Sequence, residues 1–404
     1  MDRKCKKSRL WRHSVSVTGG RTGAELSGDI IDGLMGDALT YPLASLSRLS
    51  MSTVRIIGAG PSGLAAAITL ARAGRTVEVF ERRHDCGARF GGDLQGLESF
   101  SGGDDVLNEL RAAGIDTDFA YRAFSRGFQF NGVRADLHEF ATPAFYVVRR
   151  GTTPDTIDQS LKRQALAAGV NVHFDASLDP AQAHIIATGP RQRRPYAVCR
   201  GFVFETDAPD LAVALLDDRA GLKGYSYLLV SNGEGCLCTS LWSDFRRVHA
   251  CLAEARRQLL ERWPMKVVNE RPVGGWVHFS GRPRWSEGGA LVVGEAAGLQ
   301  DFLWAFGLRA ALRSGLLAAD ALLTGENYTE RADAHFTGFI KSGVVNRFLW
   351  EMGRFGSYRA PMAALRWRGA GRLMHDFYRY NRLQQFLYPI ARGYVRVAHP
   401  HLTV

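Results

Sequence analysis

Residues 54–83 restrict the fold of this chain more than any other segment. They begin with an apolar run at 54–57, which leads into the glycine-rich stretch Gly-Ala-Gly-Pro-Ser-Gly at 58–63. Apolar residues with helical spacing follow over 64–73, and a second apolar run lies at 76–80. This order predicts a strand, a tight turn, a helix and a second strand, which together form a β-α-β unit of the nucleotide-binding type.

Each glycine of this turn has a physical task. Gly58 permits the tight turn, Gly60 lets the backbone approach a pyrophosphate, and Gly63 lets the helix pack closely on the strand. The N–H groups at the helix start hold the phosphates. Glu81 ends the second strand, where a carboxylate accepts hydrogen bonds from ribose hydroxyls and disfavours a 2′-phosphate, so FAD or NAD is expected rather than NADP. The binding residues predicted from this unit are Gly58, Gly60, Pro61, Ser62, Gly63, Glu81 and Arg82.

Composition places the chain among ordinary globular proteins. Its 404 residues leave room for two domains, and 46% of them are hydrophobic. Six cysteines occur without a CxxC pair, and no HExxH or other metal-binding spacing is present, so we predict neither a metal site nor a disulfide framework. The cytoplasm is the expected compartment.

The first fifty residues differ from the rest of the chain. They open with six basic residues between Arg3 and Arg12, and acidic residues interrupt their only apolar stretch, which argues against a signal peptide. We predict that residues 1–50 are a disordered extension or a start-site artefact. No run in the chain reaches the roughly 18 apolar residues that a membrane-spanning helix needs.

The excess positive charge gathers near the C-terminus. Residues 341–404 hold eleven Lys or Arg against two acids, which is +9 of the net +11, together with eleven aromatic residues. Such a segment is typical of helices that cover a core and place arginines in water, or of a tail that docks on an anionic membrane. We leave these two readings open and expect no nucleic-acid partner.

Predicted nucleotide-binding segments and β-rich segments alternate along the chain. The former are expected at 54–83, 184–190 and 290–323, with strand-like runs between them. We therefore predict an α/β fold with a discontinuous Rossmann-like FAD-binding domain, an inserted antiparallel β-sheet substrate domain and a C-terminal helical region. The expected bounds are 51–125, 145–200 and 285–330 for the FAD-binding domain, 126–144 and 201–284 for the substrate domain, and 331–404 for the helical tail.

Three segments, in the same order, are similar to motifs of one group of flavoenzymes. They are the fingerprint with Glu81, HIIATG at 184–189, and GGALVVGEAAGLQDFLWAFGLRAALRSGLLAA at 288–319. The chain thus resembles the FAD-dependent oxidoreductases of the p-hydroxybenzoate hydroxylase fold, and within them the geranylgeranyl-reductase-like branch. The resemblance covers about residues 52–340 and implies FAD as the cofactor. Further cofactor-binding residues that it implies are Arg89, Thr188, Gly189, Gly294, Glu295, Gly307 and Leu308, with Gln95 facing the flavin ring.

Two departures from the family pattern affect the expected chemistry. Glu295 stands where the group has Asp, so a longer carboxylate must reach the ribityl chain. Ala187-Thr188-Gly189 replaces the Ala-Asp-Gly of the hydroxylases, whose Asp helps them to handle both FAD and NADPH. Direct reduction by NADPH is therefore doubtful, and electrons are expected from a donor protein or from transiently bound NAD(P)H. A lysine within the tryptophan-rich signature of halogenases is not found.

Reduction of an alkene by a flavin needs a hydride from its N5 atom and a proton from a donor near the ring. The resemblance suggests Cys86, in the Gly-rich loop after the fingerprint, as one candidate. Tyr225 and Tyr227 are others, because GYSYLLVSNGEGCLCTSLW at 224–242 is similar to a substrate-domain strand of the reductases. His278 is expected to be an ordinary sheet residue.

The leading hypothesis is an FAD-dependent oxidoreductase that reduces or desaturates C–C bonds of a hydrophobic, prenyl-lipid or natural-product substrate. The first alternative is a monooxygenase that hydroxylates an aromatic or polyketide-like compound. Thr188, in place of the hydroxylases' Asp, argues against this alternative. The second is a flavin-binding redox module without turnover.

Overall fold

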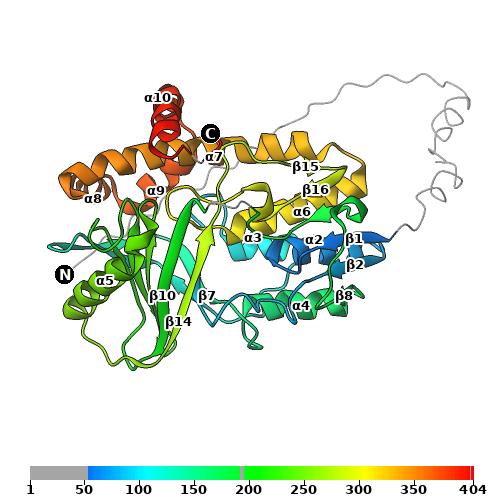
Figure 1. The fold of residues 1–404 in the computed structure, drawn as a ribbon, viewed down its shortest axis with the longest axis horizontal. Coiled ribbons are helices and arrows are strands. Elements are labelled where there is room, and N and C mark those ends of the chain that lie inside the picture. Colours follow the sequence, from blue (N-terminus) through cyan, green and yellow to red (C-terminus); the bar gives the residue numbers. More distant parts are fainter. Residues whose placement is uncertain (1–52, 192–194, 401) are drawn as a thin grey trace, which may run out of the picture. The chain divides into compact units, whose positions relative to one another are not determined.

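The computed structural model describes residues 53–191, 195–400 and 402–404. The prediction for residues 1–50 lies outside them. Among the described helices, none is long and apolar enough to cross a membrane. Figure 1 shows the arrangement of the elements over this part of the chain.

The predicted β-α-β unit forms the centre of a six-stranded sheet. β1 (Val54–Ile57) pairs in parallel with β2 (Val77–Phe80) on one side and with β9 (Ile185–Ile186) on the other. Because the parallel neighbours β9 and β16 come from distant parts of the chain, the Rossmann-like domain is discontinuous, as predicted. The remaining strands are β8 (Asn171–His173) at one edge, and β16 (Ala290–Val292) and the antiparallel β15 (Ser286–Glu287) at the other.

Helices around this sheet carry small residues at their contacts. α2 begins at Pro61, directly after the glycine turn, and packs against α6 with Gly315 at the crossing, where a Cβ would stand 2.1 Å from the carbonyl oxygen of Ser62. The bounds of the helices are α2 (Pro61–Arg72), α3 (Val106–Ala112), α4 (Ile157–Ala167) and α6 (Leu308–Thr324), with short 3₁₀ turns η1 (Pro180–Gln182) and η3 (Gly294–Ala297).

The second sheet has seven strands. Its order is β14-β10-β13-β12-β11-β5-β6, and α5 (Val248–Arg262), preceded by η2 (Phe245–Arg247), packs on one face against buried phenylalanines. The bounds are β5 (Arg126–Phe130), β6 (Ala135–Glu139), β10 (Ala197–Glu205), β11 (Leu211–Leu215), β12 (Tyr225–Ser231), β13 (Glu234–Leu241) and β14 (Val268–Val277).

Two details differ from the expectation. The inserted sheet is not wholly antiparallel, because β5 and β11 pair in parallel; some eighty residues separate them, so no hairpin sets their relative direction. The Gly-rich segment after β2 is not only a loop either. It contains β3 (Leu94–Glu98), which pairs with β7 (Phe145–Arg149). The other neighbour of β7 is β4 (Tyr121–Phe124). Because β7 lies some fifty residues after β3, no local sequence pattern indicates this strand.

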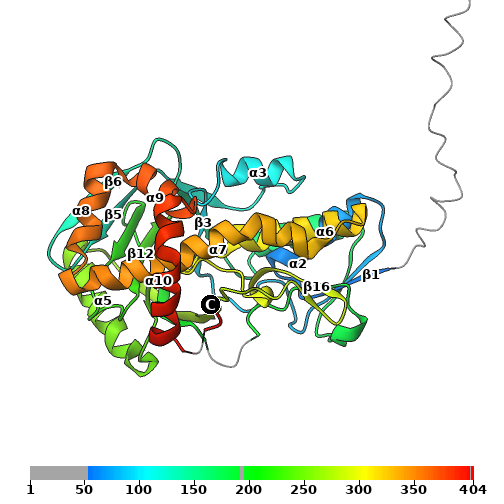
Figure 2. The ribbon, with the colours of Figure 1, turned by 90° about the horizontal axis from the view of Figure 1, so that it is seen from above.

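The tail is helical, as the sequence predicted. Figure 2 shows α10 lying across α7 on the near side. The helices are α7 (Tyr328–Gly353), α8 (Arg359–Arg368), α9 (Ala370–Tyr378) and α10 (Arg382–Ala398), with η4 (Arg354–Gly356) between α7 and α8. The bounds predicted for the domains stay a prediction.

A buried charge network holds α10 on α7. The fully buried carboxylate of Glu351 lies 2.6 Å from the ring nitrogen of His399, 3.1 Å from Nε of Arg347 and 3.2 Å from Nζ of Lys223, and it accepts a hydrogen bond from the Tyr394 hydroxyl at 2.8 Å. The pKa of Glu351 is held far below its usual range because the hydrogen bond from His399 and the charges of Arg347 and Lys223 outweigh the cost of its burial.

Removal of this carboxylate should therefore destabilise the protein. We expect Glu351→Gln to lower the free energy of unfolding by about 3 kcal/mol, because buried cations lose their counter-charge. A lowered pKa makes this contribution present at neutral pH and lost as the pH falls below the ordinary glutamate value, about 4.3. Denaturant unfolding at pH 7 and at several pH values between about 4 and about 2 measures both, because the contribution is lost progressively as the pH falls toward the lowered pKa.

The matched control is Glu326→Gln, which removes an exposed partner of Arg331. An exposed pair contributes less than about 1 kcal/mol, so this variant should unfold nearly like the wild type. Equal losses in the two variants would contradict a special role for the buried network.

Candidate functional site

One cavity of about 760 Å³ runs from the glycine turn of the Rossmann-like domain to the seven-stranded sheet. Its wall contains the ends of β1 and β2, the 187–190 segment, β3, and strands β10 to β14. The helices α8 and α9 contribute the apolar residues Leu365, Ala370 and Met374 to its wall. A volume of this size with a few polar groups is typical of a small-molecule or cofactor site.

The glycine turn has the shape that an approaching phosphate needs. At Gly58, which has a φ of 101°, a Cβ would stand 2.4 Å from the carbonyl oxygen of Ala187, and at Gly63 it would stand 2.1 Å from that of Gly58. At Gly60, by contrast, a Cβ would meet nothing within 4 Å. Gly60 is also the N-cap of α2, and no side chain caps it. The helix start therefore presents backbone N–H groups to open space, which suits an anion.

Glu81 lies beside this turn, at the end of β2. Its carboxylate accepts the backbone N–H of Ala59 at 2.9 Å and that of Arg83 at 3.0 Å, so the carboxylate is fixed against the turn. Each carboxylate oxygen has a second lone pair that can accept from a ribose hydroxyl. Pro61, Ser62 and Arg82 also line the cavity.

The second and third motifs meet the first at this edge of the sheet. The Arg89 guanidinium lies 3.5 Å from the Glu295 carboxylate and donates to the backbone carbonyl of Trp276 at 3.3 Å. Glu295 also accepts the backbone N–H of His278 at 3.2 Å. Burial raises the pKa of Glu295, and the Arg89 charge opposes that rise. The predicted residues Thr188, Gly189, Glu295, Gly307 and Leu308 all line the cavity, whereas Gly294 lies buried just behind it, with its N–H donating to the Ser314 hydroxyl at 2.8 Å.

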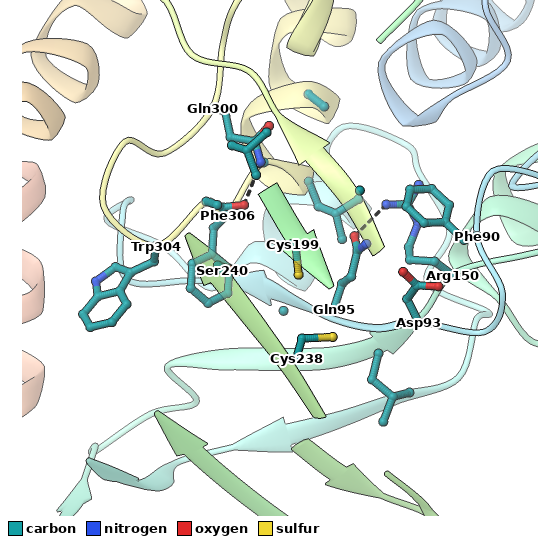
Figure 3. A pocket seen from close by; sticks show the side chains of 18 of the residues that line it. Phe90, Asp93, Gln95, Arg150, Cys199, Cys238, Ser240, Gln300, Trp304 and Phe306 are labelled. Atoms are coloured by element: carbon teal, nitrogen blue, oxygen red, sulfur yellow. Dashed lines mark hydrogen bonds between the residues drawn. The ribbon is translucent and has the colours of Figure 1, made fainter. Parts of the chain in front are cut away.

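The sequence analysis did not predict the residues Arg150 and Asp158, which fix the side chain of Gln95. The buried Arg150 guanidinium forms a two-point ion pair with Asp158, both N–O distances being 2.8 Å, and it donates to the Gln95 carboxamide oxygen at 2.9 Å. It also lies 4.1 Å from the centre of the Phe90 ring. Figure 3 shows the Gln95 side chain between this arginine and Cys199. No local motif marks Arg150, because its contacts come from three separate elements.

The two predicted tyrosines on β12 have different surroundings. The Tyr225 hydroxyl donates to the backbone carbonyl of Trp304, so its proton is already engaged in the fold. Both tyrosines line the cavity, and burial raises the pKa of each well above the usual value, but Tyr227 lies near Cys199 and Cys238 and does not make the bond to Trp304. Of the two, Tyr227 is better placed to donate a proton to a bound molecule.

Cys86 does not fit the predicted role. It is buried, and it is absent from the cavity wall although its neighbours Asp85 and Gly87 contribute to that wall. Its backbone carbonyl accepts from Gln159 on α4. The structure thus disfavours Cys86 as a proton donor beside the cavity. Among the residues that the structure describes, no group of His, Cys, Asp or Glu could hold a metal ion.

Comparison with known proteins now identifies the fold. Residues 56–93 match the model of the NAD(P)-binding Rossmann-like domain. No curated protein matches the chain by sequence. Among solved structures, a geranylgeranyl bacteriochlorophyll reductase-like protein from Thermoplasma acidophilum is 18% identical, with a TM-score of 0.57 over 73% of this chain and 87% of its own. The chain has a flavoprotein fold.

Two further structures extend this likeness. The flavin-dependent brominase Bmp2 is 16% identical, with a TM-score of 0.59 over 86% of this chain and 99% of its own. P. aeruginosa PqsL, solved with 2-aminobenzoylacetate, is 15% identical, with a TM-score of 0.51 over 76% of this chain and 99% of its own. The first two similar proteins are named for different activities, a reductase and a brominase, so the shared fold does not choose a reaction.

Alanine substitutions at two glycines of the turn can distinguish a position that leaves space for a ligand, Gly60, from one that is needed for packing, Gly63. We expect Gly60→Ala to unfold like the wild type without ligand, within about 0.5 kcal/mol, because the added methyl group meets open space and the φ of −83° suits alanine. Gly63→Ala should lose about 2 kcal/mol or more, because its Cβ collides with backbone. Denaturant unfolding of the ligand-free proteins measures the difference. A similar loss in both variants would mean that the space at Gly60 is not open.

Proposed function

We propose that this protein is an FAD-dependent oxidoreductase that reduces or desaturates C–C bonds of a hydrophobic substrate, of the prenyl-lipid or natural-product class. The observation that carries the proposal is the continuity of one cavity, which joins the phosphate-type turn at Gly60 to apolar side chains of α8 and α9. A cofactor and an apolar substrate can therefore lie in contact with each other and away from water.

The residues present fit FAD. The turn at Gly58, Gly60 and Gly63 would hold the pyrophosphate, and Glu81 would accept from the adenosine ribose. Arg89 and Glu295 would lie along the ribityl chain and the ring. FAD would supply hydride exchange at its N5 atom, which is the part of the chemistry that protein side chains do not provide.

The chain itself would orient the substrate and move a proton. Arg150, fixed by Asp158, holds the Gln95 carboxamide at one side of the cavity. The protonated hydroxyl of Tyr227 stands on the opposite sheet. We propose that Tyr227 delivers the proton that completes reduction, and that Gln95 and Arg150 act as positioning residues.

Two alternatives remain as proposals of lower rank. A monooxygenase is favoured by the resemblance of the three motifs to the hydroxylase fold and disfavoured by Thr188, which stands where the hydroxylases have Asp. A flavin-binding redox module without turnover is favoured by the Glu295 substitution. Halogenation is not proposed, because no lysine occurs among the described residues that line the cavity.

We also propose that the electron donor is a second protein or transiently bound NAD(P)H, and that the enzyme works in the cytoplasm. Its hydrophobic substrate would be met at a membrane surface, through residues 341–404. The experiments below separate these proposals from the alternatives.

The deciding experiment is an absorbance spectrum of the purified protein, before and after incubation with FAD, followed by anaerobic titration. Flavin bands that dithionite bleaches and NADPH does not would support a reductase served by another donor. Fast bleaching by NADPH with reoxidation in air would favour the monooxygenase. Absence of flavin after reconstitution would refute the proposal. Gly60→Ala should bind FAD more weakly than the wild type, because its methyl group occupies the space proposed for the pyrophosphate.

The tyrosine pair tests the proton donor. With dithionite-reduced protein and a prenyl substrate, we expect Tyr227→Phe to slow reduction about 10²-fold while FAD binding stays unchanged. Tyr225→Phe should lower the free energy of unfolding by about 1 kcal/mol, since it loses the hydrogen bond to Trp304, and should slow reduction far less. A larger rate loss in the Tyr225 variant would reverse the assignment.

A further inference from the structure

The outer face of α10 carries an unusual row of exposed apolar side chains. Leu383, Phe386, Ile390 and Val397 are 64%, 74%, 55% and 83% exposed. Their spacing of three, four and seven residues places them on one side of the helix. The opposite side packs on α7 through buried residues such as Ala391 and Val395, so α10 is apolar on two faces. We call the exposed row the α10 stripe.

Positive charge borders this stripe. Helical spacing places Arg382 beside it, one turn before Phe386, and Arg382 is exposed. The exposed Arg379 immediately precedes the helix. Neither acid of the tail offsets these charges at the surface, since Glu351 is fully buried among cations and Asp376 lies 3.8 Å from Arg368. An exposed apolar row with an arginine border is the pattern of a helix that lies in the interface of an anionic membrane.

Charge also argues against a second copy of this chain as the occupant. A two-fold dimer through the α10 stripe would bring the same surface from both copies together. The arginines beside the stripe would then face one another, and like charges at an interface are destabilising. An anionic lipid surface has the opposite charge and accepts the apolar side chains as well.

The position of α10 connects this face to the cavity. Gln384 of α10 is 3% exposed, and its side-chain amide donates to the Asn346 carboxamide oxygen on α7 at 3.0 Å and to the Phe377 backbone carbonyl on α9 at 2.7 Å. Asn346 donates to the same carbonyl at 2.8 Å. α9 in turn contributes Met374 to the wall of the cavity. Figures 1 and 2 both show α10 on the outer side of α7.

We propose that α10 docks the protein on an anionic lipid surface, with the α10 stripe in the interfacial layer and its arginines at the headgroups. Docking in this way holds α9, and the cavity wall to which it contributes, in a fixed position relative to the bilayer. The inference rests on the proposed function only for the hydrophobic nature of the substrate. The docking itself stands on the surface of α10.

Vesicle sedimentation of the full-length protein tests this. We expect it to sediment with vesicles of phosphatidylcholine and phosphatidylserine, to bind pure phosphatidylcholine vesicles at least tenfold more weakly, and to be released by high salt. Phe386→Ser with Ile390→Ser should weaken binding by about tenfold or more, since two apolar groups leave the interface. Arg379→Gln with Arg382→Gln should weaken it roughly fivefold per arginine.

The matched control is Leu166→Ser, which replaces a 48% exposed leucine on α4, outside the tail. It should bind vesicles like the wild type. Circular dichroism melting should show that all variants stay folded, because each changed side chain is exposed.

The proposal is overturned if the wild type ignores anionic vesicles, if it binds neutral ones equally well, or if the stripe variant binds unchanged. If the protein is a dimer without lipid, and the stripe substitutions make it monomeric, the α10 stripe would instead be an interface with a second copy of the chain. Flavin absorbance is recorded on the same samples. Vesicle binding without flavin would contradict the proposed function alone, and flavin without vesicle binding would contradict the docking alone.

Discussion

Contact between backbones at the glycine turn is the constraint on which the rest of this structure depends. A Cβ at Gly63 would stand 2.1 Å from the Gly58 carbonyl oxygen, and one at Gly315 would stand 2.1 Å from that of Ser62. α2 can therefore lie directly on the turn and α6 directly on α2. This packing brings the strand ends of three distant segments to one edge of the parallel sheet, where their side chains face a common cavity.

The parts of the fold and site that were predictable from the sequence are those that depend on this glycine packing. The turn, Glu81 and the later glycine motif have local requirements, such as a positive φ at Gly58 and Gly294, and local requirements leave a pattern in the sequence. Arg89 and Glu295 are 206 positions apart and still form a pair, because each follows a strand of the same sheet. The discontinuous domain was likewise predictable from the order of its motifs.

Other parts of the site depend on contacts that leave no such pattern. The Arg150 guanidinium joins Asp158 on α4 to Gln95 on β3, and none of the three lies in a recognisable motif. Cys86 follows the fingerprint in the loop where a proton donor was expected, but its side chain is buried and lies outside the cavity wall. Tyr225 and Tyr227 lie two apart on one strand and therefore on the same face, and both line the cavity. Only the hydrogen bond of Tyr225 to the distant Trp304 distinguishes the two hydroxyls.

The helical tail carries charges in two different environments, a buried network and an exposed surface. Inside, Glu351 gathers Arg347, Lys223 and His399 into a buried network, so the helices pack without an uncompensated charge. Outside, Arg379 and Arg382 stand exposed near the α10 stripe, and an apolar row that packing does not need stays in water. Stability alone would select polar residues at these exposed positions. The uneven placement of charge and apolar surface on a single helix is therefore explained by a partner that is itself both anionic and apolar, and a phospholipid surface has both properties.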